Sequence, residues 1–406
     1  MNSRVSVPSR SRKTLDSVDG NVVIGRRAVI DGAGTPPIVK VSGTIYCEGD
    51  NTFNCSVSSE KLEAEDNATI HGDLRIVNDV RVEDGSLEVH GIMTAKRVDV
   101  DAALYVSENL TAEEVDVGGS LKVDGNVESK DVDAGGSFKA KGEVDVEKID
   151  VGGSVSIESK VNITKLDVGG AAKVGGGKIR EVDIGGSFES RAPLEFEKIN
   201  VGGVVRLADD NKGGDVDVGG AFKVEGDLQF NDINVGGKVE ITGSGKGCEM
   251  DVGGKVEVGK SLDLSGNLEV GGKVDVDEKL TARNIDVGGV LRSRKATVEE
   301  CIEVGGSIIS VEGVTARCVE IGRRGKVRGS IRADRVVIGK DADAEDIYGR
   351  QILLRRGAQA ENVYGENITI ESDCCVCGEL QYTNELRIDD HVSLAKEPRK
   401  VDKLPH

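Results

Sequence analysis

The sequence predicts an all-β fold, a single-stranded parallel β-solenoid built from triangular coils of about 17 residues. Two observations predict this fold. A glycine pair returns at nearly constant spacing through the middle of the chain, and apolar residues alternate with polar ones between successive pairs. A repeat this short cannot enclose a core of its own, so each coil must stack on its neighbours.

The glycine pair occurs twelve times, and its eleven intervals are 16, 17 or 18 residues long. Because glycine adopts positive φ without steric cost, we expect these pairs to form the sharp corners of the coils. The first glycines of the twelve copies are Gly118, Gly135, Gly152, Gly169, Gly185, Gly202, Gly219, Gly236, Gly253, Gly271, Gly288 and Gly305.

Alternation of apolar and polar residues defines the strands. Counted from the first glycine of a pair, apolar residues stand three and one before it, three and five after it, and often nine after it. One copy has Val115, Val117, Leu121, Val123 and Val127 at these places. This period of two predicts short strands with one buried face. At roughly 3.3 Å per residue a coil has a contour of about 56 Å, enough for three short strands and three corners.

The same register continues on both sides of the glycine array and predicts about 22 coils between about residue 20 and about residue 390. We therefore divide the chain into a disordered N-terminal tail (1–18), N-terminal coils with a cap (19–65), a solenoid rod (66–395) with its VGG repeats at 118–306, and a disordered C-terminal tail (396–406). No apolar run has the length of a signal peptide or a membrane span, which predicts a cytoplasmic protein, free or bound at a membrane surface.

An outward position two residues before each glycine pair is acidic in ten of the twelve copies. A ladder of stacked carboxylates has two interpretations: a surface for cations or a partner, or a solvated edge that keeps the protein soluble. The residues at this position are Asp116, Asp133, Asp150, Asp167, Asp183, Asn200, Asp217, Asn234, Asp251, Glu269, Asp286 and Glu303.

Positive charge gathers at 323–356, within a chain of net charge −19. This basic patch is interpreted either as a docking site for an acidic partner, an anionic membrane or the acidic ladder of another copy, or as a solvated face. Aromatic residues are not interleaved with it as a stacking platform, so we do not expect nucleic acid as a partner.

No catalytic constellation is recognisable, and we expect neither an enzyme nor a cofactor or metal. The four histidines lie outside the glycine array. An acyltransferase-like alternative would need His71 or His90 in a groove between subunits. The eight cysteines are expected to be free thiols. Cys301 and Cys318 are one period apart and within disulfide reach, but reduced thiols are the expectation there too.

The cluster Cys374, Cys375 and Cys377 has three thiols that alternate between the two faces of a strand, and it lacks a fourth ligand nearby. We therefore do not assign a zinc site to it.

The terminal coils are left with unpaired backbone edges and exposed apolar ends, which either a cap or another copy must cover. The candidates for this contact surface are Val22, Val23, Ile24, Val29 and Ile30 at the start and Leu380, Tyr382, Leu386, Ile388, Val392 and Leu394 at the end. The alternative is that they are ordinary core and cap residues.

The segment VTARCVEIGRRGKVRGSIRADRVVIGKDADAEDIYGRQILLRRGAQAENVYGENITI, followed by CVCGELQYTNELRI, resembles the bactofilins, the polymer-forming cytoskeletal proteins. The likeness covers about residues 66 to 390. It implies a right-handed parallel β-helix that polymerises without nucleotide, through its end coils, into non-polar filaments that serve as scaffolds. The chain departs from the family by its length and by its VGG array, which is similar to archaeal relatives, and its polar start does not match the apolar membrane-binding start of some members.

We therefore expect a self-assembling cytoskeletal scaffold. The alternative is a monomeric β-solenoid spacer or a surface adhesin, which would need an export route.

Overall fold

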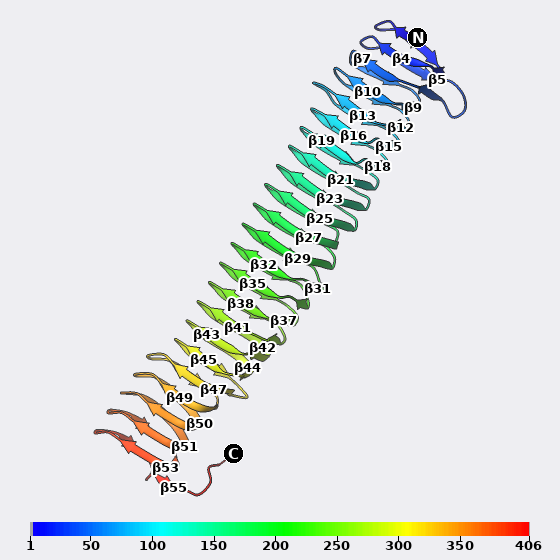
Figure 1. Ribbon diagram of the computed structural model, residues 1–406. Coiled ribbons are helices and arrows are strands. Elements are labelled where there is room, and N and C mark those ends of the chain that lie inside the picture. The colour runs from blue at the N-terminus through cyan, green and yellow to red at the C-terminus, as the bar shows by residue number, and fades with distance from the viewer. Residues whose placement is uncertain (1–2, 406) are drawn as a thin grey trace. The chain divides into compact units, whose positions relative to one another are not determined.

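A computed structural model describes residues 3–405. Every helix or strand among these residues is a β-strand, and the strands stack in parallel as a β-solenoid of about 23 turns with about 17 residues per turn. The predicted fold class is thereby confirmed. The chain divides into two units, Met1–Gly203 and Val204–His406. In each unit the strands of successive turns lie side by side (Figure 1).

The first unit holds 29 strands in its described residues. They are β1 (Ser3–Val7), β2 (Arg12–Leu15), β3 (Ser17–Val18), β4 (Gly20–Ile24), β5 (Val29–Gly32), β6 (Ile38–Val41), β7 (Thr44–Cys47), β8 (Asn51–Phe53), β9 (Ser56–Ser59), β10 (Lys61–Ala64), β11 (Ala68–Ile70), β12 (Leu74–Ile76), β13 (Asp79–Val82), β14 (Leu87–Val89), β15 (Met93–Thr94), β16 (Arg97–Val100), β17 (Ala103–Val106), β18 (Leu110–Thr111), β19 (Glu114–Val117), β20 (Ser120–Val123), β21 (Val127–Ala134), β22 (Ser137–Ala140), β23 (Val144–Val151), β24 (Ser154–Ile157), β25 (Val161–Val168), β26 (Ala171–Val174), β27 (Gly177–Ile184), β28 (Ser187–Ser190) and β29 (Leu194–Val201).

The second unit holds 26 strands in its described residues. They are β30 (Val204–Leu207), β31 (Asn211–Lys212), β32 (Asp215–Val218), β33 (Ala221–Val224), β34 (Leu228–Gln229), β35 (Asp232–Val235), β36 (Lys238–Ile241), β37 (Gly245–Gly247), β38 (Glu249–Val252), β39 (Lys255–Val258), β40 (Leu262–Leu264), β41 (Asn267–Val270), β42 (Lys273–Ala282), β43 (Asn284–Val287), β44 (Val290–Val298), β45 (Cys301–Val304), β46 (Ser307–Ser310), β47 (Val314–Ile321), β48 (Lys326–Arg328), β49 (Ile331–Ile338), β50 (Asp343–Leu354), β51 (Gln359–Ile370), β52 (Cys375–Val376), β53 (Leu380–Ile388), β54 (Ser393–Leu394) and β55 (Arg399–Lys400).

The pairing register equals the repeat, so one position in the coil becomes a column of side chains. Val115 of β19 pairs with Val132 of β21, and Leu121 of β20 pairs with Phe138 of β22. These four side chains are at most 2% exposed. The predicted alternation is therefore confirmed, and the core of each unit is a stack of mostly aliphatic layers.

A further inward column lies eleven residues after the first glycine of a pair, and the glycine period alone does not reveal it because its occupants range from glycine to phenylalanine. Val146 and Phe196 fill it in the first unit and are at most 4% exposed. In the second unit Phe230 occupies it, and Gly247 follows one turn later. A Cβ on Gly247 would lie 2.1 Å from Cε2 of Phe230, so the small residue makes room for the ring.

The corner glycines are needed for a different reason from the one expected. None of them is among the residues with positive φ. Instead, stacked corners approach each other closely: a Cβ on Gly135 would lie 2.2 Å from the carbonyl oxygen of Gly118, and one on Gly153 would lie 2.2 Å from that of Gly136. The expectation of positive φ is wrong, and close contact between the backbones of successive turns accounts for the pairs.

The prediction of a disordered N-terminal tail over 1–18 is wrong for the described residues 3–18. Strands β1, β2 and β3 form the first turn and pair with β4, β5 and β6. The physical reason is the same alternation, on a short scale: Val7, Leu15 and Val18 are buried. Residues 1 and 2 lie outside the described residues.

The prediction of a disordered C-terminal tail over 396–406 is wrong in part. Strand β55 lies in that range and pairs with β53, with Arg399 opposite Gln381 and Lys400 opposite Tyr382. Backbone hydrogen bonds to the preceding turn hold this segment, although it carries few apolar residues. Residue 406 lies outside the described residues.

Replacing Gly153 by alanine tests the corner contact. We expect a loss of about 1 to 3 kcal/mol in the free energy of unfolding, because the added methyl group overlaps the carbonyl oxygen of Gly136. Guanidinium unfolding of the variant measures the loss. Ser154→Ala is the matched control, since the neighbouring side chain is exposed. Equal stability of the two variants would contradict the close-contact explanation.

Candidate functional site

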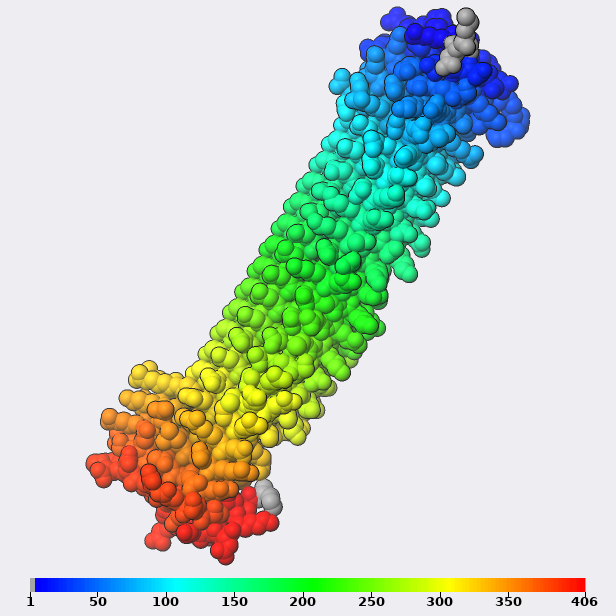
Figure 2. Space-filling model, viewed as in Figure 1, coloured from blue at the N-terminus to red at the C-terminus, as the bar shows by residue number. Residues whose placement is uncertain are grey.

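The last turn of the second unit exposes apolar side chains that are buried one turn earlier. Leu386 and Ile388 of β53 pair in register with Ile368 and Ile370 of β51. Ile368 and Ile370 are at most 1% exposed, whereas Ile388 is 40% exposed and Leu386 is half-buried. The aliphatic column therefore ends uncovered. Figure 2 shows the last residues, in red, at the surface of this end of the unit.

The outer backbone edge of this turn is also incompletely paired. Within residues 3–405, β53 pairs along its length with β51, but on its other side only Gln381 and Tyr382 pair with β55. Val392 and Leu394, near β54, are half-buried. Leu380 is 2% exposed and belongs to the core. Of the C-terminal candidates, Tyr382, Leu386, Ile388, Val392 and Leu394 therefore lie at an accessible surface.

The N-terminal candidates do not lie at the end of the first unit. Val22 and Ile24 are 0% exposed because β1 covers them, with Val5 opposite Val22 and Val7 opposite Ile24. Val23 lies on the same strand and points outward between them. The choice of these three residues as end surface is wrong, because it assumed that the chain before residue 19 is disordered.

A lysine stands at the end of the first unit where a coil would place an apolar residue. Lys13 pairs in register with the buried Ile30, and its Nζ donates a hydrogen bond to the carbonyl oxygen of Ser6 at 3.3 Å. Next to it Arg12 forms an ion pair with Asp31 at 2.6 Å. A charged side chain therefore ends the column of Ile30, although the same turn also contains the buried Val7, Leu15 and Val18. Strands β1, β2 and β3 each pair on one side only within residues 3–405.

The acidic ladder forms as predicted, with Asp116 opposite Asp133 and Asp133 opposite Asp150. Partial burial and the nearby carboxylates, Asp133 first, raise the pKa of Asp116. Lys148 lies 3.4 Å from Asp150 and neutralises part of the charge. Within residues 3–405, no three His, Cys, Asp or Glu side chains are grouped to hold a metal ion.

The basic patch 323–356 is partly neutralised within the second unit. Four of its arginines form ion pairs of 2.9 to 3.7 Å, and they are Arg323 with Asp341, Arg328 with Glu345, Arg350 with Asp334, and Arg356 with Asp373. Within the described residues, Arg324, Lys326, Arg335, Lys340 and Arg355 have no acidic side chain within ion-pair distance.

Aromatic residues do lie beside this patch, which the sequence pattern did not indicate. Tyr348 and Tyr364 stack with ring centroids 5.0 Å apart, and the guanidinium of Arg332 lies 4.1 Å from the Tyr348 centroid. Burial, followed by the nearby Glu379 carboxylate, raises the pKa of Tyr364 to about 12. Because Arg332 and Tyr364 stack on Tyr348, this column contributes cohesion between turns.

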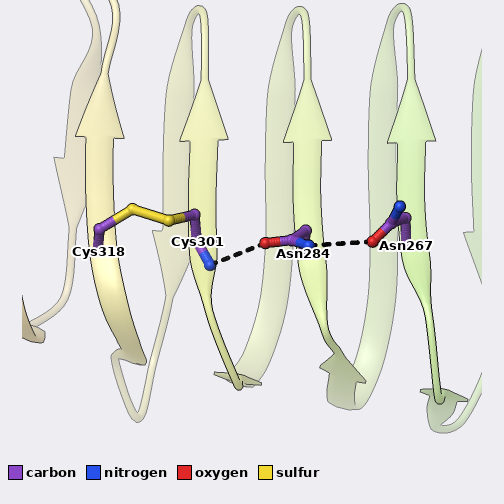
Figure 3. Close-up of a disulfide and its surroundings, with 4 residues drawn as sticks. All are labelled: Asn267, Asn284, Cys301 and Cys318. Atoms are coloured by element: carbon purple, nitrogen blue, oxygen red, sulfur yellow. Dashed lines mark hydrogen bonds between the residues drawn. A yellow bond between two sulfur atoms is a disulfide. The ribbon is translucent and has the colours of Figure 1, made fainter.

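Cys301 and Cys318 form a disulfide between successive turns, with Cα atoms 4.6 Å apart (Figure 3). The expectation of reduced thiols is wrong here, because in-register parallel pairing of β45 with β47 sets the two cysteines directly opposite each other. The column continues through Asn284, which accepts a hydrogen bond from the Cys301 amide and donates one to Asn267, both at 3.1 Å.

The other six cysteines are free thiols, as expected. Cys374 is buried, whereas Cys375 and Cys377 lie on the outer surface with their sulfur atoms 3.4 Å apart. His71 and His90 are both exposed and stack with ring centroids 5.0 Å apart.

Comparisons of the chain with family models, curated proteins and solved structures find no match. Within residues 3–405 no helix has the length and apolar composition needed to cross a membrane.

Removing the disulfide is expected to loosen the turns that it joins. In the Cys301→Ser/Cys318→Ser variant, the region should lose about 3 kcal/mol of stability, because the cross-link no longer closes its loop in the unfolded chain. Hydrogen exchange of strands β43 to β49 measures the loss. Cys248→Ser removes a free thiol elsewhere in the unit and is the control. Unchanged exchange rates in the double variant would contradict a stabilising cross-link.

Neutralising one carboxylate tests the ladder. Asp116 binds its proton more tightly in the folded than in the unfolded chain, so its ionised form opposes folding at neutral pH, and this opposition disappears as the pH falls below the carboxyl range. Asp116→Asn should therefore gain about 0.5 kcal/mol of stability at pH 7 and nothing at pH 3. Unfolding curves at both pH values measure it. Asp150→Asn, which also loses its contact with Lys148, should show no such gain.

Proposed function

We propose that the chain is a non-enzymatic cytoskeletal scaffold of the bactofilin type, which assembles into filaments without nucleotide through its terminal turns. The observation that carries this proposal is the uncovered end of the second unit. Ile388 is 40% exposed, while its neighbour in the column, Ile370, is 0% exposed. Within residues 3–405, no residue of a following turn pairs with Leu386 or Ile388, so this aliphatic column is left uncovered.

Hydrophobic burial gives this end a reason to associate. A fully buried aliphatic side chain contributes about 1.5 to 3 kcal/mol relative to an exposed one. Leu386 and Ile388 form this surface, the half-buried Leu394 ends the separate column of Val376, and the incompletely paired edge of β53 offers backbone donors and acceptors. A second copy stacked on this turn would bury the apolar side chains and pair the backbone groups of β53, as each turn inside the unit does for its neighbour.

The first turn contributes to assembly by a different means. Its strands β1, β2 and β3 have free edges in the described residues, so another copy can pair with their backbone. Lys13 and Arg12 make this end polar, so its association should depend on ionic strength more than that of the last turn. The basic patch 323–356 is a second contact surface in this proposal, for an acidic partner or a membrane.

Lys13 on the first turn favours one alternative function, a monomeric spacer, because a charged side chain at the end of a column opposes the stacking of another copy there. Sedimentation velocity and negative-stain microscopy of the full chain, at several protein and salt concentrations without nucleotide, separate the two. Filaments support the scaffold. A monomer under all these conditions contradicts it and supports the spacer.

A charge placed on the last turn should block assembly. We expect Ile388→Lys to raise the critical concentration for filament formation about tenfold or more, because the interface would have to bury an ammonium group in place of an aliphatic one. Light scattering and pelleting measure this. Val311→Lys is the matched control: Val311 is 85% exposed in the turn between β46 and β47, away from the terminal turn. Equal loss of assembly in both variants, or in neither, would contradict the role of the last turn.

A further inference from the structure

A pair of thiols stands on the outer surface of the turn that also carries Leu386 and Ile388, because both segments pair with the same strand β51. Cys375 and Cys377 are separated by one residue, Val376, which is 1% exposed and faces the core. Because side chains alternate along a strand, the two cysteines lie on the same outward face. Their sulfur atoms are 3.4 Å apart. Cys374, next to them, is buried.

This geometry brings the two sulfur atoms close to bonding distance. A disulfide needs its sulfur atoms about 2.05 Å apart and its Cα atoms within about 4.4 to 6.8 Å of each other. Two residues along a strand advance about 6.6 Å, which lies at the upper end of that range. A disulfide also needs its Cβ atoms about 3.5 to 4.5 Å apart, closer than two same-face side chains of an extended segment. Forming it between Cys375 and Cys377 therefore requires the backbone to bend at Val376.

Accessibility separates this pair from the three buried free cysteines, and proximity separates it from Cys248, which is half-buried but is not joined to another cysteine by a hydrogen bond or a disulfide within residues 3–405. Cys377 is exposed and Cys375 is half-buried, so a small reagent can reach both. Cys47, Cys55 and Cys374 are buried, and burial raises their pKa, to about 12 for Cys47 and to about 11 for Cys55. The hydrogen bond with Cys375 raises the pKa of Cys377 as well, so exposure and not pKa distinguishes the pair. The structure thus offers one accessible pair of adjacent thiols within residues 3–405.

We propose that Cys375 and Cys377 are a redox-active dithiol, which a low-molecular-weight disulfide converts reversibly into an intrastrand disulfide. The Cys377 thiolate attacks one sulfur of the small disulfide, its S–S bond breaks, and one thiolate leaves. The Cys375 thiolate then attacks the Cys377 sulfur of the mixed disulfide and displaces the second thiolate. The two cysteines together lose two protons and two electrons, and the small disulfide becomes two thiols.

Oxidation of this pair should act on the short strand β54, which pairs with the cysteine segment from the following turn. The Cys375 and Cys377 amides donate hydrogen bonds to the preceding turn, where the carbonyl oxygens of Ala358 and Ala360 accept them. From the following turn, the Ser393 amide donates to the carbonyl oxygen of Cys374 at 2.9 Å, and the Ala395 amide donates to that of Val376 at 3.0 Å. The outer strand β54 has only two residues, so a bend at Val376 should loosen it first. This consequence for assembly rests on the proposed function, whereas the thiol chemistry does not.

The experiment uses the full chain equilibrated with reduced and oxidised glutathione at a series of ratios. Free thiols are then trapped by alkylation, and peptides are mapped by mass spectrometry. We expect the peptide that contains both cysteines to lose the mass of two hydrogen atoms as the buffer becomes more oxidising, and to regain it on reduction. A wild-type chain that stays reduced in the most oxidising buffer would overturn the proposal, as would a stable glutathione adduct on Cys377.

Three variants make the assignment specific. Cys374→Ser should oxidise like the wild type, because the buried thiol takes no part. Cys375→Ser should stop at the glutathione adduct on Cys377, because the resolving thiol is missing, and Cys377→Ser should lose most of its reaction with glutathione. Intrastrand oxidation that depends on Cys374 would overturn the pairing.

Hydrogen exchange of residues 393–395 in the oxidised and reduced chain tests the effect on β54. Faster exchange after oxidation is expected, and equal rates would overturn the proposed effect on β54. Filament pelleting of the same samples is a separate readout. Failure to assemble in either redox state counts against the proposed function alone, while the mass measurement decides the dithiol by itself.

Discussion

Stacking of each turn on the next is the constraint on which the rest of the structure depends. A turn of about 17 residues cannot satisfy its own backbone or enclose its own side chains. The strands therefore find their hydrogen-bond partners one turn away, as Val127 does with Val144, and Val144 in turn with Val161. Because the register equals the repeat, every position of the coil becomes a column that runs through a unit, and neighbours in a column must suit each other.

The columns explain features that look unrelated in the sequence. At the corners, stacked backbones come so close that a Cβ has no room, and glycine recurs. On the outer faces, like residues meet like: carboxylates repel in the acidic ladder, two tyrosines stack, and two cysteines bond. Inside, a large ring at Phe230 is matched by Gly247 one turn later. Each arrangement is a consequence of parallel pairing without a shift in register.

Within residues 3–405, the first turn and the turn of β53 each lack a complete neighbouring turn on one side, and they differ in the side chains that lie there. The first turn ends in a lysine whose ammonium group reaches a backbone carbonyl, which replaces apolar surface by a hydrogen bond. The last turn ends in aliphatic side chains that continue a buried column and are left uncovered. An end of the second kind gains free energy from another copy, and this difference underlies the proposed assembly. The dithiol Cys375 and Cys377 lies in the same turn as these aliphatic side chains, and the short strand β54 pairs with that part of the turn on the side away from β51.

The repeat by itself determined the fold class, the strand alternation and the positions of the corners, because a solenoid translates sequence period directly into register. It also placed Cys301 and Cys318 in adjacent turns, but their bond depended on the direct opposition that only the folded strands provide. Position along the chain could not show that residues 3–18 form a turn, since Val7 and Leu15 become core residues only when β4 and β5 lie beneath them. Nor could it show that Lys13 closes one end, or that Ile388 remains open at the other. Those properties depend on whether another strand packs on the one in question, and only the tertiary structure decides that.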